Sequence, residues 1–149
     1  HTFRERLEAF RKRVAEGGGS CLEIVDDRIL VEDGDVQSAS PLAMREVVDR
    51  LLDGPADARP TGVFLTADIL APGFYGEMQR RALMPGRDLD IVSCNNEKPL
   101  LAHLNPRPAT IDIHAEKVGR QAVEQLFWRI GHPDEPRVTL ALDPTLTRQ

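Results

Sequence analysis

Short apolar runs alternate with amphipathic helical patterns along this chain, and this alternation restricts the possible fold more than any other feature. Gly62–Leu65 is a continuous apolar run of the kind that is buried on both faces of a parallel sheet. Further strands are predicted at Leu89–Cys94 and Ala109–Ile113, each reached after a break in the chain that follows a helical segment. The sequence therefore predicts an α/β fold with a mostly parallel, open sheet flanked by helices.

The predicted helices carry apolar residues at spacings of three and four. Thr2–Glu16 shows this pattern, and consecutive glycines follow it as a stop signal. A second helix begins at Pro41, which suits a first turn, with Ser38 or Ser40 as its cap. Ala115–Ile130 is the last strong helix. Weaker patterns predict a helix that contains Phe74, Met78 and Leu83, and a short helix at 98–104.

Two more strands are predicted outside the central alternation. Ile29–Val31 is a short apolar run that acidic residues end, and Val138–Leu142 reads as a final strand after a proline-containing turn at 132–136. The segment 53–60 contains glycine and two prolines and is interpreted as a surface loop.

The composition indicates one ordinary globular domain with an acidic balance. The 149 residues are 41% hydrophobic and 29% charged, which is enough to bury a sizeable core. The net charge of −5 gives no basic footprint, so direct DNA binding by this segment is disfavoured. No stretch approaches the roughly 20 apolar residues that cross a bilayer, so we expect no membrane partner. The cysteine usage described next predicts a cytoplasmic chain. Cys21 and Cys94 are interpreted as reduced core thiols, with a disulfide as the alternative.

Four stretches of the chain carry motifs in a fixed order. Arg6–Phe10 is similar to an Arg-x-x-Gly-Phe helix with alanine in place of the glycine, and Arg59–Asp68 is similar to a Pro-Thr-Ala-Val-Phe-x-x-Asn-Asp strand and turn. Leu83–Asn96 contains a proline-led turn that feeds a strand ending in polar residues. Arg107–Ile111 and Val118–Ala122 are similar to Pro-x-Leu-Thr-Thr-Ile and Leu-Gly-x-x-Ala. Together these stretches resemble the effector domain of bacterial transcription repressors of the LacI/GalR type.

This resemblance implies the type I periplasmic-binding-protein fold, in which two lobes joined by crossover segments bind an effector between them. Residues 1–108 would then form most of the C-terminal lobe, 109–136 the crossover and the return helix of the N-terminal lobe, and 137–149 the final strand. Because the chain opens without methionine on a helical turn, we expect a fragment of the effector-binding domain that lacks the DNA-binding headpiece. The implied partners are a small effector, such as a sugar or related polyol, operator DNA through the headpiece, and a second copy in a homodimer.

Four residues are candidates for the effector site. Ligands of open α/β sheets bind outside the carboxyl ends of the strands, which singles out the loop around Val36 together with Asp68 and Asn95. The resemblance implies that Arg6 reaches the effector, and its fork of donors suits hydroxyls or an anion; the alternative is a solvated helix residue. Asn95 stands where the family usually has an aspartate, and its amide both donates and accepts. Asp68 either contacts the ligand or caps the helix that follows it.

The sequence favours a binding function over catalysis. His103 and His132 are isolated and lack metal-ligand spacing, and no Gly-rich phosphate loop or nucleophile elbow is visible, so no cofactor is expected. The leading hypothesis is an allosteric regulator in which effector binding changes the geometry of a DNA-binding dimer. One alternative is a periplasmic sugar-binding receptor of a transport system. The other is a small Rossmann-like hydrolase or transferase, for which no catalytic set is recognisable.

Overall fold

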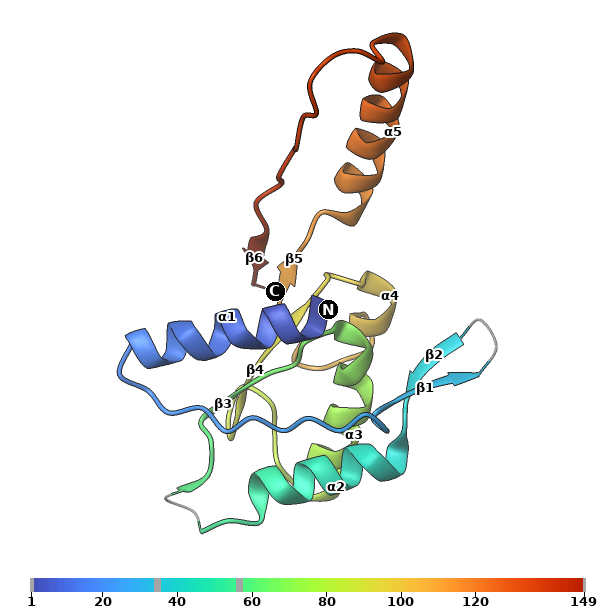
Figure 1. Cartoon of the computed structure of the whole chain (residues 1–149). Coiled ribbons are helices and arrows are strands. Elements are labelled where there is room, and N and C mark those ends of the chain that lie inside the picture. The colour runs from blue at the N-terminus through green and yellow to red at the C-terminus, as the bar shows by residue number, and fades with distance from the viewer. Residues whose placement is uncertain (1, 34–35, 56–57, 149) are drawn as a thin grey trace.

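A four-stranded sheet lies at the centre of the computed structural model, which describes residues 2–33, 36–55 and 58–148 (Figure 1). The strands, in their order across the sheet, are β3 (Gly62–Phe64), β4 (Asp90–Cys94), β5 (Ala109–Asp112) and β6 (Thr145–Thr147). β3 pairs in parallel with β4 and β4 in parallel with β5, whereas β6 is antiparallel to β5. The predicted α/β fold with a mostly parallel sheet is therefore confirmed.

The helices lie close to where the apolar spacing placed them. They are α1 (Thr2–Glu16), α2 (Pro41–Leu52), the short 3-10 helix η2 (Asp68–Leu70), α3 (Ala71–Arg80), α4 (Lys98–Leu101) and α5 (Ala115–Gly131). Of the two candidate caps of α2, Ser40 has this role, because its side chain accepts a hydrogen bond from the Ala43 backbone N–H at 3.4 Å. Leu83 lies beyond the end of α3, and α4 is shorter than predicted.

The core lies between α2, α3 and one face of the sheet. Buried side chains from both helices, among them Val48 and Phe74, pack in one cluster with Ile91 of β4. Val63 of β3 packs against this cluster. Because successive residues of a strand point to opposite faces, the next residue, Phe64, points away from it. Its ring stacks on Phe10 of α1 with centroids 4.9 Å apart. The helix α1 therefore covers the other face of the sheet.

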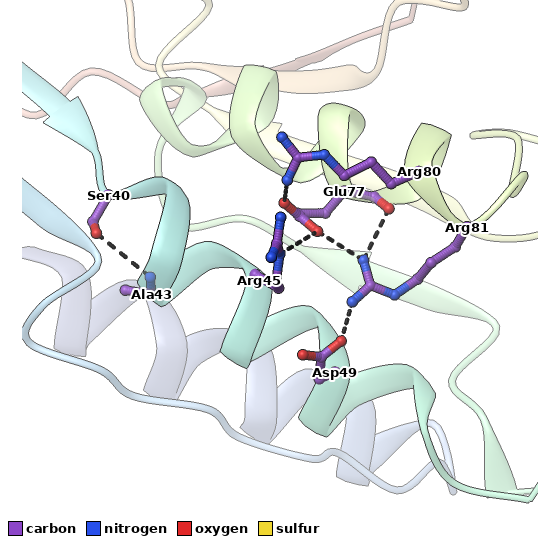
Figure 2. Close-up of polar contacts among 7 residues, drawn as sticks. All are labelled: Ser40, Ala43, Arg45, Asp49, Glu77, Arg80 and Arg81. Carbon is purple, nitrogen blue, oxygen red and sulfur yellow. Dashed lines mark hydrogen bonds and ion pairs between the residues drawn. The ribbon is translucent and has the colours of Figure 1, made fainter.

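An ionic cluster joins α2 to α3 at the edge of this core (Figure 2). The Glu77 carboxylate is only 4% exposed and accepts from Arg81 at 2.8 Å, with Arg45 at 3.8 Å and Arg80 also in contact. Arg81 also pairs with Asp49 of α2. A buried carboxylate needs such partners, since an unpaired charge is costly in a low-dielectric interior. These contacts hold the two helices in register.

A separate hairpin precedes α2. β1 (Leu30–Asp33) and β2 (Val36–Ala39) pair antiparallel, with Asp33 opposite Val36. The predicted strand at Ile29–Val31 thus begins one position later than expected. The hairpin forms a two-stranded sheet of its own and does not join the central sheet.

The C-terminal part of the chain contradicts one prediction. Figure 1 shows α5 and the extended chain after it projecting away from the other helices, with the chain returning to the sheet as β6. Val138–Leu142 has no strand hydrogen bonding, so the prediction of a final strand there is wrong; the strand is Thr145–Thr147. A strand needs a neighbouring strand, and in the described part of the chain none lies beside Val138–Leu142.

Two smaller expectations concern the cysteines and the membrane. Both cysteines are reduced; Cys94 is buried as predicted, whereas Cys21 is partly exposed and is not a core thiol. Within the described residues, no helix combines the length and the apolar character that a membrane span requires.

Candidate functional site

Polar side chains gather where β3, β4 and β5 end, at the carboxyl edge of the parallel strands. The loop after β3 carries Thr66 and Asp68, and β4 is followed by Asn95 and Asn96. The N-terminal half of α1 brings Arg6 to the same edge. This edge is where open α/β sheets bind ligands. We refer to these residues together with Asp112, the last residue of β5, as the edge site.

Arg6 is held at the edge site by the packing of α1. The Phe10–Phe64 stack fixes the helix over β3, and one turn earlier the Arg6 guanidinium donates to the Thr66 carbonyl oxygen at 2.7 Å. Arg6 is half-buried. This burial differs from the alternative interpretation of Arg6 as a solvated helix residue. A guanidinium carries five N–H groups, so one bond to Thr66 leaves most of its donor capacity for other acceptors.

The Arg6 charge also reaches a buried thiol in the neighbouring strand. Burial raises the pKa of Cys94, and the nearby Asp68 carboxylate acts in the same direction, while Arg6 opposes both. Cys94 therefore stays a neutral thiol next to the edge site, with no sign of an activated nucleophile.

Asp68 is a completely buried carboxylate that joins two neighbouring segments. One oxygen accepts from the Glu97 backbone N–H at 2.6 Å and the other from the Thr110 hydroxyl at 3.0 Å. The position before it, Ala67, caps η2, and no side-chain capping bond is present there. The capping alternative for Asp68 is therefore wrong, because its carboxylate turns to the loop after β4 instead. Asp68 fixes the position of the loop that carries Asn95.

The two asparagines after β4 adopt positive φ angles, 119° for Asn95 and 60° for Asn96. Asn tolerates this region better than most residues, so the tight turn is suited to its sequence. The Asn95 amide nitrogen donates to Glu97 at 2.8 Å, and that of Asn96 donates to Asp112 at 3.0 Å. Both side-chain carbonyl oxygens are buried and have no hydrogen-bond partner within the described residues, as is also true of the Ser93 hydroxyl. A buried acceptor without a protein partner is satisfied by ordered water or by a ligand.

Asp112 links the edge site to the crossover between the sheet and α5. It accepts from the His114 backbone N–H at 2.7 Å and from Asn96, and these two hydrogen bonds lower the pKa of its carboxyl group. His114 has φ 54°, and its Nε2 lies 3.2 Å from the Thr145 hydroxyl of β6. The Asp112 carboxylate therefore joins the loop after β4 to His114, whose ring contacts β6.

The structure brings three of the four predicted site residues together. Arg6, Asp68 and Asn95 lie at one edge, whereas the backbone of Val36 lies in the antiparallel hairpin, opposite Asp33. Sequence reasoning missed Asn96 and Asp112. Asn96 stood in the motif that contains Asn95, and Asp112 was a polar interruption within the predicted strand at Ala109–Ile113.

The edge site offers hydrogen-bond donors and acceptors and little reactive chemistry. In the described ranges of the chain, no group of three or more His, Cys, Asp or Glu side chains could hold a metal ion. A guanidinium beside primary amides is the donor and acceptor set that suits hydroxyl-rich or other polar small molecules.

Comparison with known proteins agrees with this geometry. The whole chain, residues 1–149, matches the model of the periplasmic binding protein-like domain. The chain belongs to this family. Within the family, it is 38% identical to the ribose operon repressor of Haemophilus influenzae over 88 residues, which are 59% of this chain and 26% of that protein. It is 29% identical over 143 residues to the HTH-type transcriptional repressor PurR of Aliivibrio fischeri, covering 96% of this chain and 40% of that one.

Solved structures of the family show the same fold. A LacI family transcriptional regulator from Enterococcus faecium with bound ribose aligns with a TM-score of 0.63 at 24% identity, over 73% of this chain and 39% of that one. The predicted resemblance to LacI/GalR-type repressors and to the periplasmic-binding-protein fold is thus confirmed. The chain spans less than half the length of the curated relatives that it matches.

Proposed function

We propose that this chain is the ligand-sensing part of a LacI-type transcriptional regulator and that its edge site binds a small effector, a sugar or related polyol. The observation that carries the proposal is the convergence of the Arg6 guanidinium with the unsatisfied carbonyl oxygens of Asn95 and Asn96 at one edge of the sheet. A sugar hydroxyl both donates and accepts, so it can satisfy an amide oxygen and receive a bond from a guanidinium.

We infer that the cleft has a second wall outside this chain. Residues 1–108 would form the lobe described above, 109–136 the crossover and a helix of the other lobe, and 137–149 the final segment. The exposure of apolar residues along α5, with Phe127 at 70%, favours packing of this helix against protein outside the chain. The remaining part of a full-length regulator would supply that wall and, in a separate headpiece, the DNA-reading helix.

In this proposal the effector shifts the population of the regulator between two conformations. Closure of two lobes around the ligand would favour one geometry of a homodimer over another, which changes operator affinity without any chemical step. The relatives named above are transcriptional repressors, which favours this function over a periplasmic transport receptor and over catalysis. A regulator of this kind would work in the cytoplasm, where operator DNA lies.

The test is calorimetric titration of the full-length regulator with D-ribose and a panel of pentoses, hexoses and disaccharides. Arg6→Ala and Asn95→Ala each leave ligand hydroxyls unpaired, at a cost of about 1 to 3 kcal/mol per group. We therefore expect the affinity for the sugar that binds to fall by about tenfold to a hundredfold. Arg4→Ala is the matched control, because residues two apart on a helix point to nearly opposite sides and Arg4 is exposed.

Asn95→Asp distinguishes the ligand classes. The new carboxylate still accepts from sugar hydroxyls but no longer donates to Glu97, so a sugar site should lose less affinity than a site for an anionic effector. If both alanine variants bind the effector as tightly as the parent protein, the edge site is not the effector site.

A further inference from the structure

An aromatic residue that the sequence analysis did not single out extends the apolar stripe of α1. Phe3, Leu7, Phe10 and Val14 recur at spacings of four and three, so they share one face of the helix. The last three are half-buried against the rest of the molecule, whereas Phe3 is 43% exposed. A residue on the sheet-facing stripe is thus left partly uncovered.

The reason is that α1 runs past the end of the strands. Phe10 stacks on Phe64, the last residue of β3, and Arg6 contacts the carbonyl of Thr66 two residues further along the chain. Each helical residue advances about 1.5 Å, so Phe3 lies about 4.5 Å beyond Arg6 in the same direction. The stripe therefore continues past the Phe10–Phe64 stack toward the edge site, where Phe3 is partly exposed.

The Phe3 ring and the Arg6 guanidinium lie next to each other. The guanidinium carbon is 5.9 Å from the ring centroid, within the range of a cation–π contact. The guanidinium lies over one face of the ring, so a polar fork and an apolar surface are presented together at the edge site. This pairing suits a ligand with hydroxyls on its rim and an apolar face.

We propose that Phe3 determines effector specificity by packing its exposed ring against the C–H face of a cyclic sugar whose hydroxyls Arg6 and Asn95 bind. This inference rests on the proposed function and extends it to a residue that contributes no hydrogen bond. A sugar ring has an apolar face of C–H groups, and an aromatic side chain offers large contact area at low cost in conformational entropy. An acyclic polyol has no such rigid face.

The experiment measures binding of D-ribose and of its acyclic counterpart, ribitol, to the full-length regulator by calorimetry. Phe3→Ala should weaken ribose binding about three- to tenfold and ribitol binding much less. Phe3→Tyr should restore the ribose affinity, and Phe3→Leu should restore only part of it. Leu42→Ala, which removes an apolar side chain of α2 that is even more exposed than Phe3, is the control and should leave binding unchanged. The thermal midpoint without ligand shows that each variant is folded.

The outcomes separate this inference from the proposed function. If Arg6→Ala weakens ribose binding while Phe3→Ala does not, the edge site binds the sugar but Phe3 does not determine specificity. If Phe3→Ala lost the same affinity for ribose and for ribitol, the result would also contradict packing of Phe3 on the face of a sugar ring. If neither ribose nor any sugar of the panel binds the parent protein, the proposed function fails, and the inference fails with it.

Discussion

At the scale of single residues, buried polar groups decide the shape of the edge site. Asp68 is completely buried and accepts from the Glu97 backbone N–H and the Thr110 hydroxyl, so both carboxylate oxygens are satisfied within the chain. The carbonyl oxygens of Asn95 and Asn96 are equally buried and lack protein partners among the described residues. The first arrangement is structural, whereas the second is suited to a ligand.

Asp68 and Asn95 could be placed at one edge from the sequence, because parallel strands bring their carboxyl ends together, whereas Arg6 was assigned to the site by the family resemblance. The partners of Asp68 could not be predicted, since they come from residues 29 and 42 positions away. The sequence around Val36 does not reveal whether its strand joins the parallel sheet or pairs in a separate hairpin, as it does in the structure. Whether Val36 contacts an effector stays a prediction.

Tyr75 gives a residue-scale prediction on pH. Its hydroxyl donates to the Pro106 carbonyl oxygen at 2.9 Å, and burial raises its pKa to about 12. A raised pKa in the folded state favours the neutral phenol, so this contribution to stability is present at neutral pH. It is lost as the pH rises from the unfolded value of about 10 through 12. Because Tyr75 is the single tyrosine, phenolate absorbance reports it directly.

We expect a titration midpoint near 12 for the folded chain and near 10 for the chain unfolded in guanidinium chloride. Tyr75→Phe should remove the signal from both. A midpoint near 10 in the folded chain would show that the hydroxyl is solvated.

At the scale of elements, helices were easier to predict than strands. The bounds of α1 agree with the prediction because all its hydrogen bonds lie within the segment and its apolar stripe is local. Val138–Leu142 has an equally clear apolar pattern but no strand hydrogen bonding, since a strand depends on a neighbour that a sequence pattern does not specify. β6 forms instead where Leu146 meets Ile111 of β5.

The ionic cluster between α2 and α3 gives a prediction at this scale. Glu77→Gln removes the charge that Arg45, Arg80 and Arg81 share, while Glu77 itself is 4% exposed. Breaking a fully buried ion pair costs about 3 to 5 kcal/mol, but two of these arginines are largely exposed to solvent. We therefore expect the free energy of unfolding in urea to fall by about 1 to 3 kcal/mol.

Glu46→Gln is the matched control on α2, because Glu46 pairs with Arg28 on an exposed surface. Exposed pairs contribute at most about 1 kcal/mol. An equal loss of stability in the two variants would mean that burial of Glu77 has no particular role in joining the helices.

At the scale of the whole molecule, a packed part and a projecting part differ in how they bury apolar side chains. The sheet and the helices α2, α3 and α4 enclose the core, whereas no residue of α5 is buried (Figure 1). The exposed apolar side chains of the projecting part come from α5 and from the chain after it: Val118, Val123, Leu126, Phe127, Ile130, Val138, Leu140 and Leu142. Soluble monomers rarely leave so many apolar side chains together in water.

The last prediction follows from this exposed surface. The 149-residue chain on its own should self-associate, because each buried Leu or Phe side chain contributes about 1.5 to 3 kcal/mol relative to its exposed state. The double substitution Leu126→Ser and Phe127→Ser removes two of the most exposed apolar side chains of α5, at 59% and 70%. It should shift the chain toward the monomer by at least about tenfold in dissociation constant, measured by sedimentation and light scattering over a concentration series. Leu22→Ser and Val25→Ser, at 63% and 64% exposure but outside α5, serve as the matched control and should leave the association unchanged. A chain that stays monomeric at every concentration would contradict the idea that this surface is made for contact with protein.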